Sequence, residues 1–225
     1  MDLAHRLLAL WGVASFAGWA AGPFLAAGTW NWPAGWIYFA VTLAGLLAHG
    51  SYVRSHNPGL REKRRRLGEG TPRWDLAWNA LVWPWFASAP IAAGLAQRLG
   101  RPAGPVWLVP LGAAVFAAGL AVSARAMSVN PFFEATARLQ TDAGQRVIDA
   151  GPYRFVRHPG YLGLALWGLS APAVLRCAWA LPSAGMVALW LVLRTALEDR
   201  MLRRGLAGYQ DYAARVRFRL LPGLW

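Results

Sequence analysis

Residues 33–53 read PAGWIYFAVTLAGLLAHGSYV and contain no Asp, Glu, Lys or Arg. A helix needs about 20 apolar residues to cross the hydrocarbon core of a bilayer, and this stretch has that length. Five further apolar blocks lie around it, at residues 7–27, 76–96, 103–124, 160–175 and 178–193. The last two are short, so they form either two spans, which we favour, or a re-entrant helical hairpin. The pattern predicts an all-α, polytopic membrane helix bundle with six spans.

The composition agrees with a membrane protein. Only 15% of the 225 residues are charged and 56% are hydrophobic, whereas a soluble domain carries about 25% charged residues. Fourteen tryptophans argue against a disordered chain. The single cysteine, Cys177, excludes an internal disulfide framework. The net charge of +13 fits two partners, which are nucleic acid and the anionic surface of a membrane.

The placement of the charges decides between these partners. With six spans and a cytoplasmic N-terminus, twenty of the 23 Lys and Arg residues and all ten acidic residues fall on cytoplasmic segments. The exceptions are Arg98, Arg101 and Arg176. This asymmetry follows the positive-inside rule, and no aromatic residue interrupts the basic run at 62–66. We therefore expect membrane lipids and no nucleic acid as partners, and both termini in the cytoplasm.

We divide the chain into two regions. Residues 1–125 hold the first four helices and a basic cytoplasmic loop at 54–75, and residues 126–225 hold a catalytic region with the last two helices.

The polar connection between the fourth and fifth blocks is longer than two neighbouring helices need, and such long loops are often functional. Asn130 precedes a proline and should end the fourth helix. Polar and aromatic side chains then gather where the fifth block begins, namely Tyr153, Arg154, Arg157, His158 and Tyr161. They indicate a site, or anchoring in the membrane interface.

A second polar group follows the sixth block. Arg194 and Glu198 are four residues apart, which predicts an ion pair on one face of a helix. Glu198 and Asp199 lie near a helix C-terminus, where an anion is disfavoured by the helix dipole. Such a placement suggests that they meet a cation, although a solvated, salt-bridged face is the alternative. The basic tail at 209–219 is predicted to be amphipathic and to lie on the membrane surface.

Residues 151–163, GPYRFVRHPGYLG, resemble the GPY-x-x-x-RHP-x-Y-x-G signature of a family of membrane methyltransferases. That family includes isoprenylcysteine carboxyl methyltransferases, phospholipid N-methyltransferases and bacterial methanethiol S-methyltransferases. The second half of the family pattern is matched by Glu198, Asp199, Leu202, Tyr209, Tyr212 and the basic, proline-containing end at 215–222. The resemblance covers residues 120–225. One departure is Asp199, because the family usually has a second Glu there.

The resemblance implies S-adenosylmethionine as the methyl donor. Its cofactor-binding residues would be Gly151, Pro152, Tyr153, Arg157, His158, Pro159, Tyr161, Gly163 and Glu198. Arg157 and His158 suit the donor's carboxylate and Glu198 suits its ammonium, while tyrosine faces attract the sulfonium. Arg194, Glu198 and Arg157 are the candidate catalytic residues. Asn130 and Arg194 are the candidates for binding the acceptor.

The nature of the acceptor stays open. It is small or lipophilic, and its nucleophile is oxygen, nitrogen or sulfur, so phospholipid N-methylation and thiol S-methylation are alternatives to carboxyl methylation. A small transporter or membrane scaffold is the alternative outside enzymes. The sequence has no pattern of metal ligands, so we expect no metal. The resemblance implies an integral protein of the inner (cytoplasmic) membrane of a bacterium.

Overall fold

The computed structural model describes residues 18–65 and 70–225, and these residues form helices and connections without any β-strand. The prediction of an all-α fold is therefore confirmed. The helices are α2 (Pro33–His56), α3 (Leu60–Arg65), α4 (Arg73–Arg98), α5 (Leu108–Val129), α6 (Pro159–Val174), α7 (Leu181–Gly205) and α8 (Tyr209–Arg215). Three short 3-10 turns are η1 (Thr141–Ala143), η2 (Gly151–Arg154) and η3 (Ala178–Ala180). Residues 18–27 are also helical, and the rest of the first apolar block lies outside the described residues.

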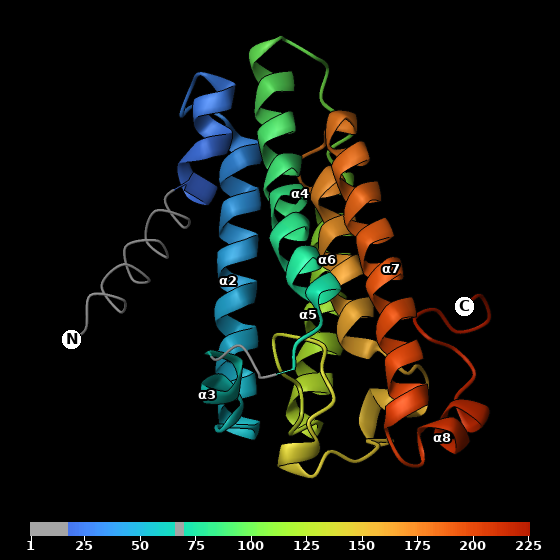
Figure 1. The fold of residues 1–225 in the computed structure, drawn as a ribbon. Helices are drawn as coiled ribbons and strands as arrows, with labels where there is room; N and C mark the ends of the chain where they lie inside the picture. Colours follow the sequence, from blue (N-terminus) through green and yellow to red (C-terminus); the bar gives the residue numbers. More distant parts are fainter. Residues whose placement is uncertain (1–17, 66–69) are drawn as a thin grey trace.

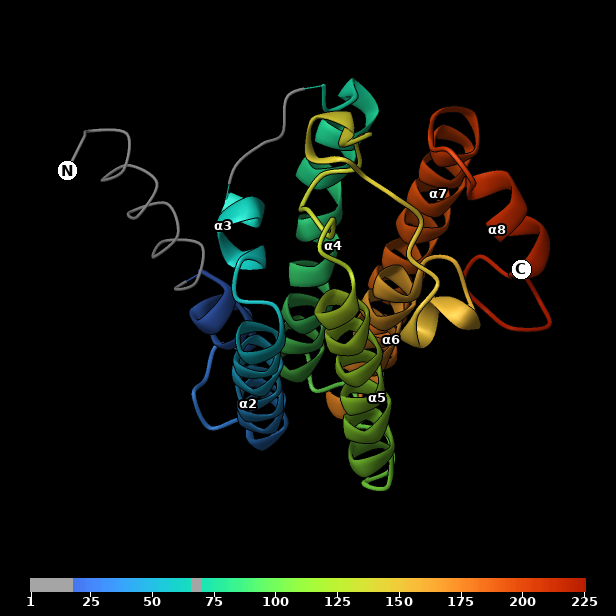
Figure 2. The same cartoon turned by 90° about the horizontal axis from the view of Figure 1, so that it is seen from below.

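The five long helices α2, α4, α5, α6 and α7 stand side by side and alternate in direction along the chain (Figure 1). One end of the bundle, drawn at the bottom of Figure 1, carries α3, residues 130–158 and α8. We call this the lower end. Figure 2 looks at it directly and shows the 130–158 connection crossing beneath the helices. The three segments that the charge pattern predicts to be cytoplasmic therefore share one end of the molecule.

Within residues 18–65 and 70–225, three segments are long and apolar enough to cross a membrane, namely Pro33–His56, Leu108–Val129 and Ala178–Gly205. Helix α4 has 26 residues, but Pro84 and Pro90 lie within it and its tryptophans and an asparagine lower its mean hydropathy. Helix α6 has only 16 residues, which corresponds to about 24 Å. The structure therefore supports an integral membrane protein with three clear spans.

Helices α6 and α7 are antiparallel neighbours that are joined by a tight turn. Among the described residues, Arg176 is the one non-glycine residue with a positive φ, at 54°. Its Nε donates a hydrogen bond to the Gly104 carbonyl at 2.6 Å, and its own carbonyl accepts one from the Gly104 N–H at 2.8 Å. The turn is thus fixed to the connection between α4 and α5. Helix α7 then continues to Gly205, well beyond the end of the predicted block at residue 193.

Glycines let α5 and α6 pack in backbone contact. A Cβ on Gly119 would lie 2.7 Å from the Gly163 carbonyl oxygen, and a Cβ on Gly163 would collide with the Gly119 carbonyl. A Cβ on Gly112 would lie 2.7 Å from the Val174 amide at the other end of the same contact. Close approach through small residues is typical of membrane helix pairs. This contact holds the start of α6, which carries the RHP motif, against the end of α5.

The C-terminal helix differs from its prediction. Helix α8 is short, and its apolar face packs on protein, because Tyr209, Tyr212 and Ala213 form a buried cluster with Leu202 of α7. Leu139, Val147, Leu206 and Val216 extend this cluster. The expectation that the tail rests its apolar face on the membrane surface is therefore wrong for α8, since the end of α7 and the 130–158 connection already cover that face.

Candidate functional site

A cavity of about 550 Å³ lies between α2, α4, α5, α6 and α7 and reaches the connection at the lower end. Its inner wall is mostly apolar and includes Leu46, Trp83, Leu120, Leu164 and Trp167. Its wall toward the lower end includes Gln140, Val147, Ile148, Leu202, Leu206, Tyr209 and Tyr212. Charged and polar side chains lie between these two parts, among them Tyr161, Arg194 and Glu198. The cavity therefore joins an apolar chamber to a mixed, hydrogen-bonding one.

Arg194 of α7 lines this cavity and is buried. Its guanidinium carbon lies 4.0 Å from the ring centre of Trp78 and 5.1 Å from that of Tyr161. Its Nη2 is 2.9 Å from Asp75 Oδ1 and donates to the Ala135 carbonyl at 3.1 Å. The predicted ion pair with Glu198 is thus wrong, because the arginine turns toward α4 and pairs with Asp75 there. Its Nε is buried and finds no partner among the described residues.

Glu198 has a different partner. The Tyr161 hydroxyl donates a short hydrogen bond to Glu198 Oε2, and both side chains line the cavity. Tyr161 also lies face to face with His158, with ring centres 5.8 Å apart and an interplanar angle of 8°. Glu198 is only partly buried and forms no ion pair within the described chain, so its carboxylate is available to a cationic ligand.

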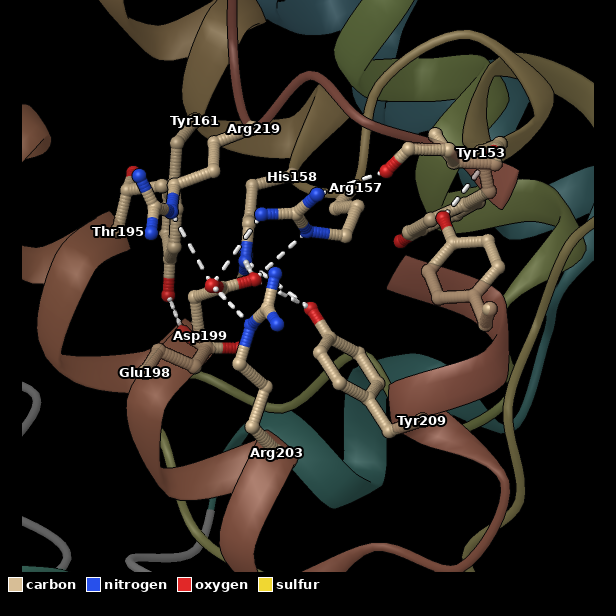
Figure 3. Close-up of polar contacts among 12 residues, drawn as sticks. Tyr153, Arg157, His158, Tyr161, Thr195, Glu198, Asp199, Arg203, Tyr209 and Arg219 are labelled. Atoms are coloured by element: carbon tan, nitrogen blue, oxygen red, sulfur yellow. Dashed lines mark hydrogen bonds and ion pairs between the residues drawn. The ribbon is translucent and has the colours of Figure 1, made fainter. Parts of the chain in front are cut away.

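Asp199 is a structural centre, as Figure 3 shows. Its carboxylate is 1% exposed and faces three arginines and a tyrosine from four segments. It accepts from Arg157 Nε at 2.7 Å, Arg203 Nε at 3.0 Å, Arg219 Nε at 3.1 Å and the Tyr209 hydroxyl at 3.0 Å. His158 Nε2 lies 3.5 Å away. This position, where the family usually has Glu, therefore ties the start of α6 to α7, α8 and the C-terminal residues.

Arg157 has partners on every side. Besides Asp199, its Nη1 donates to the carbonyls of Val216 and Arg217 at 2.7 and 2.8 Å. The backbone N–H groups of Arg157 and His158 donate to the carbonyls of Phe218 and Arg219. Both side chains still line the cavity, so the roles expected of them toward a cofactor stay predictions. The contacts within the protein give Arg157 a structural role as well.

Asn130 and Tyr153 form a pair at the cavity wall. Asn130 Nδ2 donates to the Tyr153 hydroxyl at 2.9 Å, and its Oδ1 accepts from the Phe132 N–H. The Tyr212 hydroxyl donates to the Tyr153 carbonyl at 2.7 Å. Burial raises the pKa of the Tyr153 and Tyr209 phenols well above the usual value of 10, and the Asp199 carboxylate adds to this at Tyr209. Both phenols are therefore neutral at pH 7 and serve as hydrogen-bonding groups.

Three of the predicted cofactor residues do not line the cavity. Gly151 has φ +58° at the start of η2, a conformation that glycine adopts without strain. Pro152 follows it inside the same turn, and Pro159 is the first residue of α6, where its missing N–H costs nothing. Gly163 reaches the cavity but also packs on α5. These positions shape the backbone that carries the side chains of the site.

Sequence reasoning missed several residues of the site. Asp75 is fully buried and accepts from the Ala137 N–H at 2.8 Å as well as pairing with Arg194. Trp78 covers Arg194, and Gln140 is a buried amide in the cavity wall. The one available signal was an acidic residue at the start of an apolar block, which Asp75 is. Among the described residues, no cluster of three or more His, Cys, Asp or Glu is arranged to hold a metal ion.

Comparison with known proteins assigns this region. The Lamin-B receptor of Drosophila melanogaster is 33% identical over 134 residues, which cover 53% of this chain and 18% of the receptor. The chain thus matches less than a fifth of the length of this curated relative. Residues 111–204 match the model of the isoprenylcysteine carboxyl methyltransferase (ICMT) family. They contain most of α5, the 130–158 connection with its GPY and RHP motifs, α6, and almost all of α7 with Arg194, Glu198 and Asp199. The region that builds most of the cavity therefore belongs to the isoprenylcysteine carboxyl methyltransferase family, as its motifs predicted.

Proposed function

We propose that this protein transfers a methyl group from S-adenosylmethionine to a lipophilic acceptor that enters the cavity from the bilayer. The observation that carries the proposal is the two-part cavity, which Arg194 lines. One part is lined by leucines and tryptophans between the helices, and the other by tyrosines, an amide and aliphatic side chains at the lower end, with charged side chains between the two. A methyl donor with a polar nucleoside and an acceptor with an apolar tail need these two environments on either side of one reacting centre.

The residues of the lower part fit the donor. S-adenosylmethionine supplies a methyl group on a sulfonium, and transfer by in-line displacement depends mainly on how the two reactants are positioned. Glu198 and the faces of Tyr161 and His158 offer a cation the charge and aromatic surface that it prefers. Around Asp199 three guanidiniums meet one carboxylate, which leaves a positive field next to the cavity for the donor's carboxylate.

Arg194 is suited to orient the acceptor. The ring of Trp78 and the Asp75 carboxylate hold its guanidinium in place. Its unpartnered Nε can donate to an oxygen, a neutral nitrogen or a thiolate of the acceptor. The apolar chamber between Leu46, Leu120 and Trp167 would hold the acceptor's hydrocarbon part. This arrangement supports a nucleophile that stands at the boundary of the two chambers.

We extend the proposal to the topology. Helices α4 and α6 complete six spans together with the first apolar block and the three clear spans, and the lower end faces the cytoplasm of a bacterial cell. The arginines outside the lower end, Arg98, Arg101 and Arg176, are few compared with those in α3, the 130–158 connection and the C-terminal region. The cavity would then open toward the cytoplasmic pool of the donor.

Isothermal titration of the purified full chain with S-adenosylmethionine and S-adenosylhomocysteine tests donor binding. We expect wild type to bind both. Glu198→Gln should weaken binding of S-adenosylmethionine by about tenfold or more, because hydrogen bonds to charged groups contribute about 1.5–3 kcal/mol. Asp211→Asn, on the exposed face of α8, is the matched control and should bind as wild type does. Absence of binding by folded wild type would reject the methyltransferase function and favour a transporter or scaffold.

The acceptor is then identified by product. Transfer of a radiolabelled methyl group is measured with prenylcysteine, phospholipid and small thiol pools offered separately in detergent. Label in the prenylcysteine carboxyl supports carboxyl methylation, whereas label in lipid headgroups or thiols would move the assignment to N- or S-methylation. Donor binding without transfer to any of the three pools would reject the proposed acceptor classes.

A further inference from the structure

His49 is an ionisable side chain inside a membrane-spanning helix. It belongs to α2 and stands about two helical turns before the last residue of that helix. The imidazole is partly buried and lines the cavity. Ionisable side chains within membrane spans are costly and usually serve a function. His49 lies outside the matched region 111–204, so the motifs of the family do not contain it.

Ser123 of α5 fixes the tautomer of this imidazole. His49 Nε2 lies 3.3 Å from Ser123 Oγ, and the Ser123 hydroxyl donates to Met127 Sδ at 3.9 Å. Because the hydroxyl proton points to the sulfur, the Ser123 oxygen accepts, and His49 Nε2 is assigned as an N–H donor. Nδ1 has no hydrogen-bond partner in the part of the chain that the structure describes. Nδ1 therefore carries the lone pair of the neutral ring and can take up a proton.

The contact with Ser123 places the imidazole near the level of the reacting centre. A Cβ on Gly163 would lie 2.8 Å from Ser123 Cβ, so Ser123 stands against the beginning of α6. Tyr161 is only two residues earlier on that helix, which corresponds to about 3 Å along the axis. Leu46, one turn before His49 on α2, lines the apolar chamber. The imidazole thus stands between the apolar chamber and the polar side chains, where the proposed function places the nucleophile of the acceptor.

The proposed role of Arg194 calls for a proton acceptor. An N–H donor can bind a thiolate or a neutral amine, but it cannot bind an ammonium group, which has no lone pair. Thiols and alkylamines are mostly protonated at pH 7, so they must lose a proton before they can attack. An imidazole has an unperturbed pKa of about 6.5 and is largely neutral at that pH. His49 therefore has the right chemistry for a general base.

Other candidate bases of the cavity are already engaged. The Asp75 carboxylate pairs with Arg194, and Glu198 accepts from a phenol. His158, another histidine of the cavity wall, has its Nε2 3.3 Å from the Tyr209 hydroxyl oxygen. His49 has a free basic nitrogen, which sets it apart from these three residues.

Arg64 of α3 is the charged side chain that acts on His49. It also lines the cavity, and its Nη1 donates to the carbonyls of Phe133 and Glu134 at 3.4 and 3.1 Å. A guanidinium has no acceptor for a proton. Its positive charge repels an imidazolium, so it helps to pass the proton on to water once the methyl group has been transferred.

We propose that His49 Nδ1 is the general base of the methyl transfer and that the acceptor is a thiol or an amine. The proton of the acceptor S–H or N–H group passes to Nδ1. The freed electron pair forms a bond to the methyl carbon, and the carbon–sulfur bond of the donor breaks with its electrons left on the sulfur of S-adenosylhomocysteine. The imidazolium then loses its proton to water. This inference rests on the proposed function and narrows it, because a carboxylate acceptor needs no base.

His49→Gln tests the base directly. Glutamine keeps an N–H donor for Ser123 and has no basic nitrogen. His56→Gln is the matched control, since His56 is a histidine of the same helix that is exposed and does not line the cavity. Methyl transfer to an alkyl thiol, an alkylamine and a prenylcysteine carboxylate is measured across neutral and alkaline pH, each with the purified full chain in detergent.

At pH 7, His49→Gln should lower the rate with the thiol or the amine by about a hundredfold, as expected for the loss of a general base. It should bind S-adenosylhomocysteine as wild type does. The deficit should shrink as the pH approaches the pKa of the acceptor, because the acceptor then loses its proton unaided. His56→Gln should follow wild type at every pH. A deficit of the same size at every pH would indicate a structural role and overturn the proposal.

The pH profile of wild type is a second test that needs no variant. A rate with the thiol or amine that reaches its plateau near neutral pH, below the pKa of the acceptor itself, supports a base in the protein. A rate that keeps rising up to the pKa of the acceptor overturns the role of His49. This comparison decides the question even if His49→Gln does not fold.

The two proposals fail in different ways. If folded wild type binds no donor and methylates none of the three acceptors, the methyltransferase function and the role of His49 are both rejected. If wild type methylates the carboxylate and neither the thiol nor the amine, only the role of His49 is rejected.

Discussion

Arg194 combines a structural and a chemical task. Its Nη2 pairs with the buried Asp75, and its Nε is buried without a partner among the described residues. Removing it therefore leaves an acid buried without its cation, a change that is strongly destabilising in proteins. A test of its role in methyl transfer must separate folding from turnover.

We predict that Arg194→Ala lowers turnover at least tenfold more than it lowers donor affinity. The reason is that, in the proposed arrangement, the donor contacts Glu198 and the lower chamber and Arg194 orients the acceptor. Rates of methyl transfer and titrations with S-adenosylhomocysteine measure the two effects. Arg200→Ala, on an exposed face of the same helix, is the matched control. Wild-type turnover by Arg194→Ala would show that the residue takes no part in the reaction. If the further change Asp75→Ala restores stability, the loss of stability in Arg194→Ala comes from the unpaired Asp75 carboxylate.

The contacts of Asp199 explain why the shorter aspartate can stand where the family usually has Glu. Its carboxylate reaches three arginines in a fully buried position, where an additional methylene group would have to displace well-packed neighbours. The carboxylate at this position therefore stabilises the fold of the protein itself.

Asp199→Asn should lower the unfolding free energy by about 3–5 kcal/mol, because it leaves the buried Arg157 guanidinium without its counter-ion. Thermal unfolding in detergent measures the effect. Asp142→Asn is the matched control, since Asp142 also accepts from an arginine, Arg138, but is exposed. Equal melting of the two variants would contradict the central role of Asp199. Donor binding by Asp199→Asn below its melting temperature should persist, weakened.

At the scale of helices, the contact between α5 and α6 positions the RHP motif. Gly119 and Gly163 face each other with carbonyl oxygens where a side chain would stand. A methyl group on either one must push the helices apart. Because Tyr161 stands within the first turn of α6, such a shift would also move it relative to Glu198.

Gly163→Ala is expected to destabilise the protein by about 1–3 kcal/mol through overpacking and to reduce methyl transfer. Gly185→Ala in α7 is the control, because nothing lies within 4 Å of a Cβ there, and alanine favours the helix by up to about 1 kcal/mol over glycine. Melting temperatures of the two variants in the same detergent provide the comparison. A Gly163→Ala protein as stable as Gly185→Ala would show that the helices separate without cost.

The elements differ in how far sequence could predict them. Asn130 and Pro131 predicted the end of α5 because proline restricts the residue before it, and α5 does end at Val129. The partner of Arg194 could not be predicted in this way, since the i, i+4 rule sees only neighbours on one helix. Asp75 comes from α4, and only the packing of α4 on α7 brings the two together.

For the whole molecule, the charge pattern predicts which end faces the cytoplasm. We predict that a membrane-impermeant maleimide labels Ala103→Cys in intact cells and labels Ala150→Cys only after the membrane is opened. Both positions are exposed, one between α4 and α5 and the other at the lower end. Cys177→Ser provides the background without other thiols. The opposite labelling pattern would reverse the proposed orientation, and labelling of both in intact cells would exclude the six-span topology.

The length of α6 has a consequence for the membrane itself. At about 24 Å the helix is shorter than the hydrocarbon core of about 30 Å. If the upper end of α6 is level with the upper ends of the adjacent helices, His158 and Tyr161 at its start lie about one helical turn deeper in the membrane than the lipid headgroups. A lipid-anchored acceptor could then reach the reacting centre by lateral diffusion alone, without lifting its tail out of the bilayer. Hydrophobic mismatch, normally a small cost to a membrane protein, would here set the depth at which the chemistry takes place.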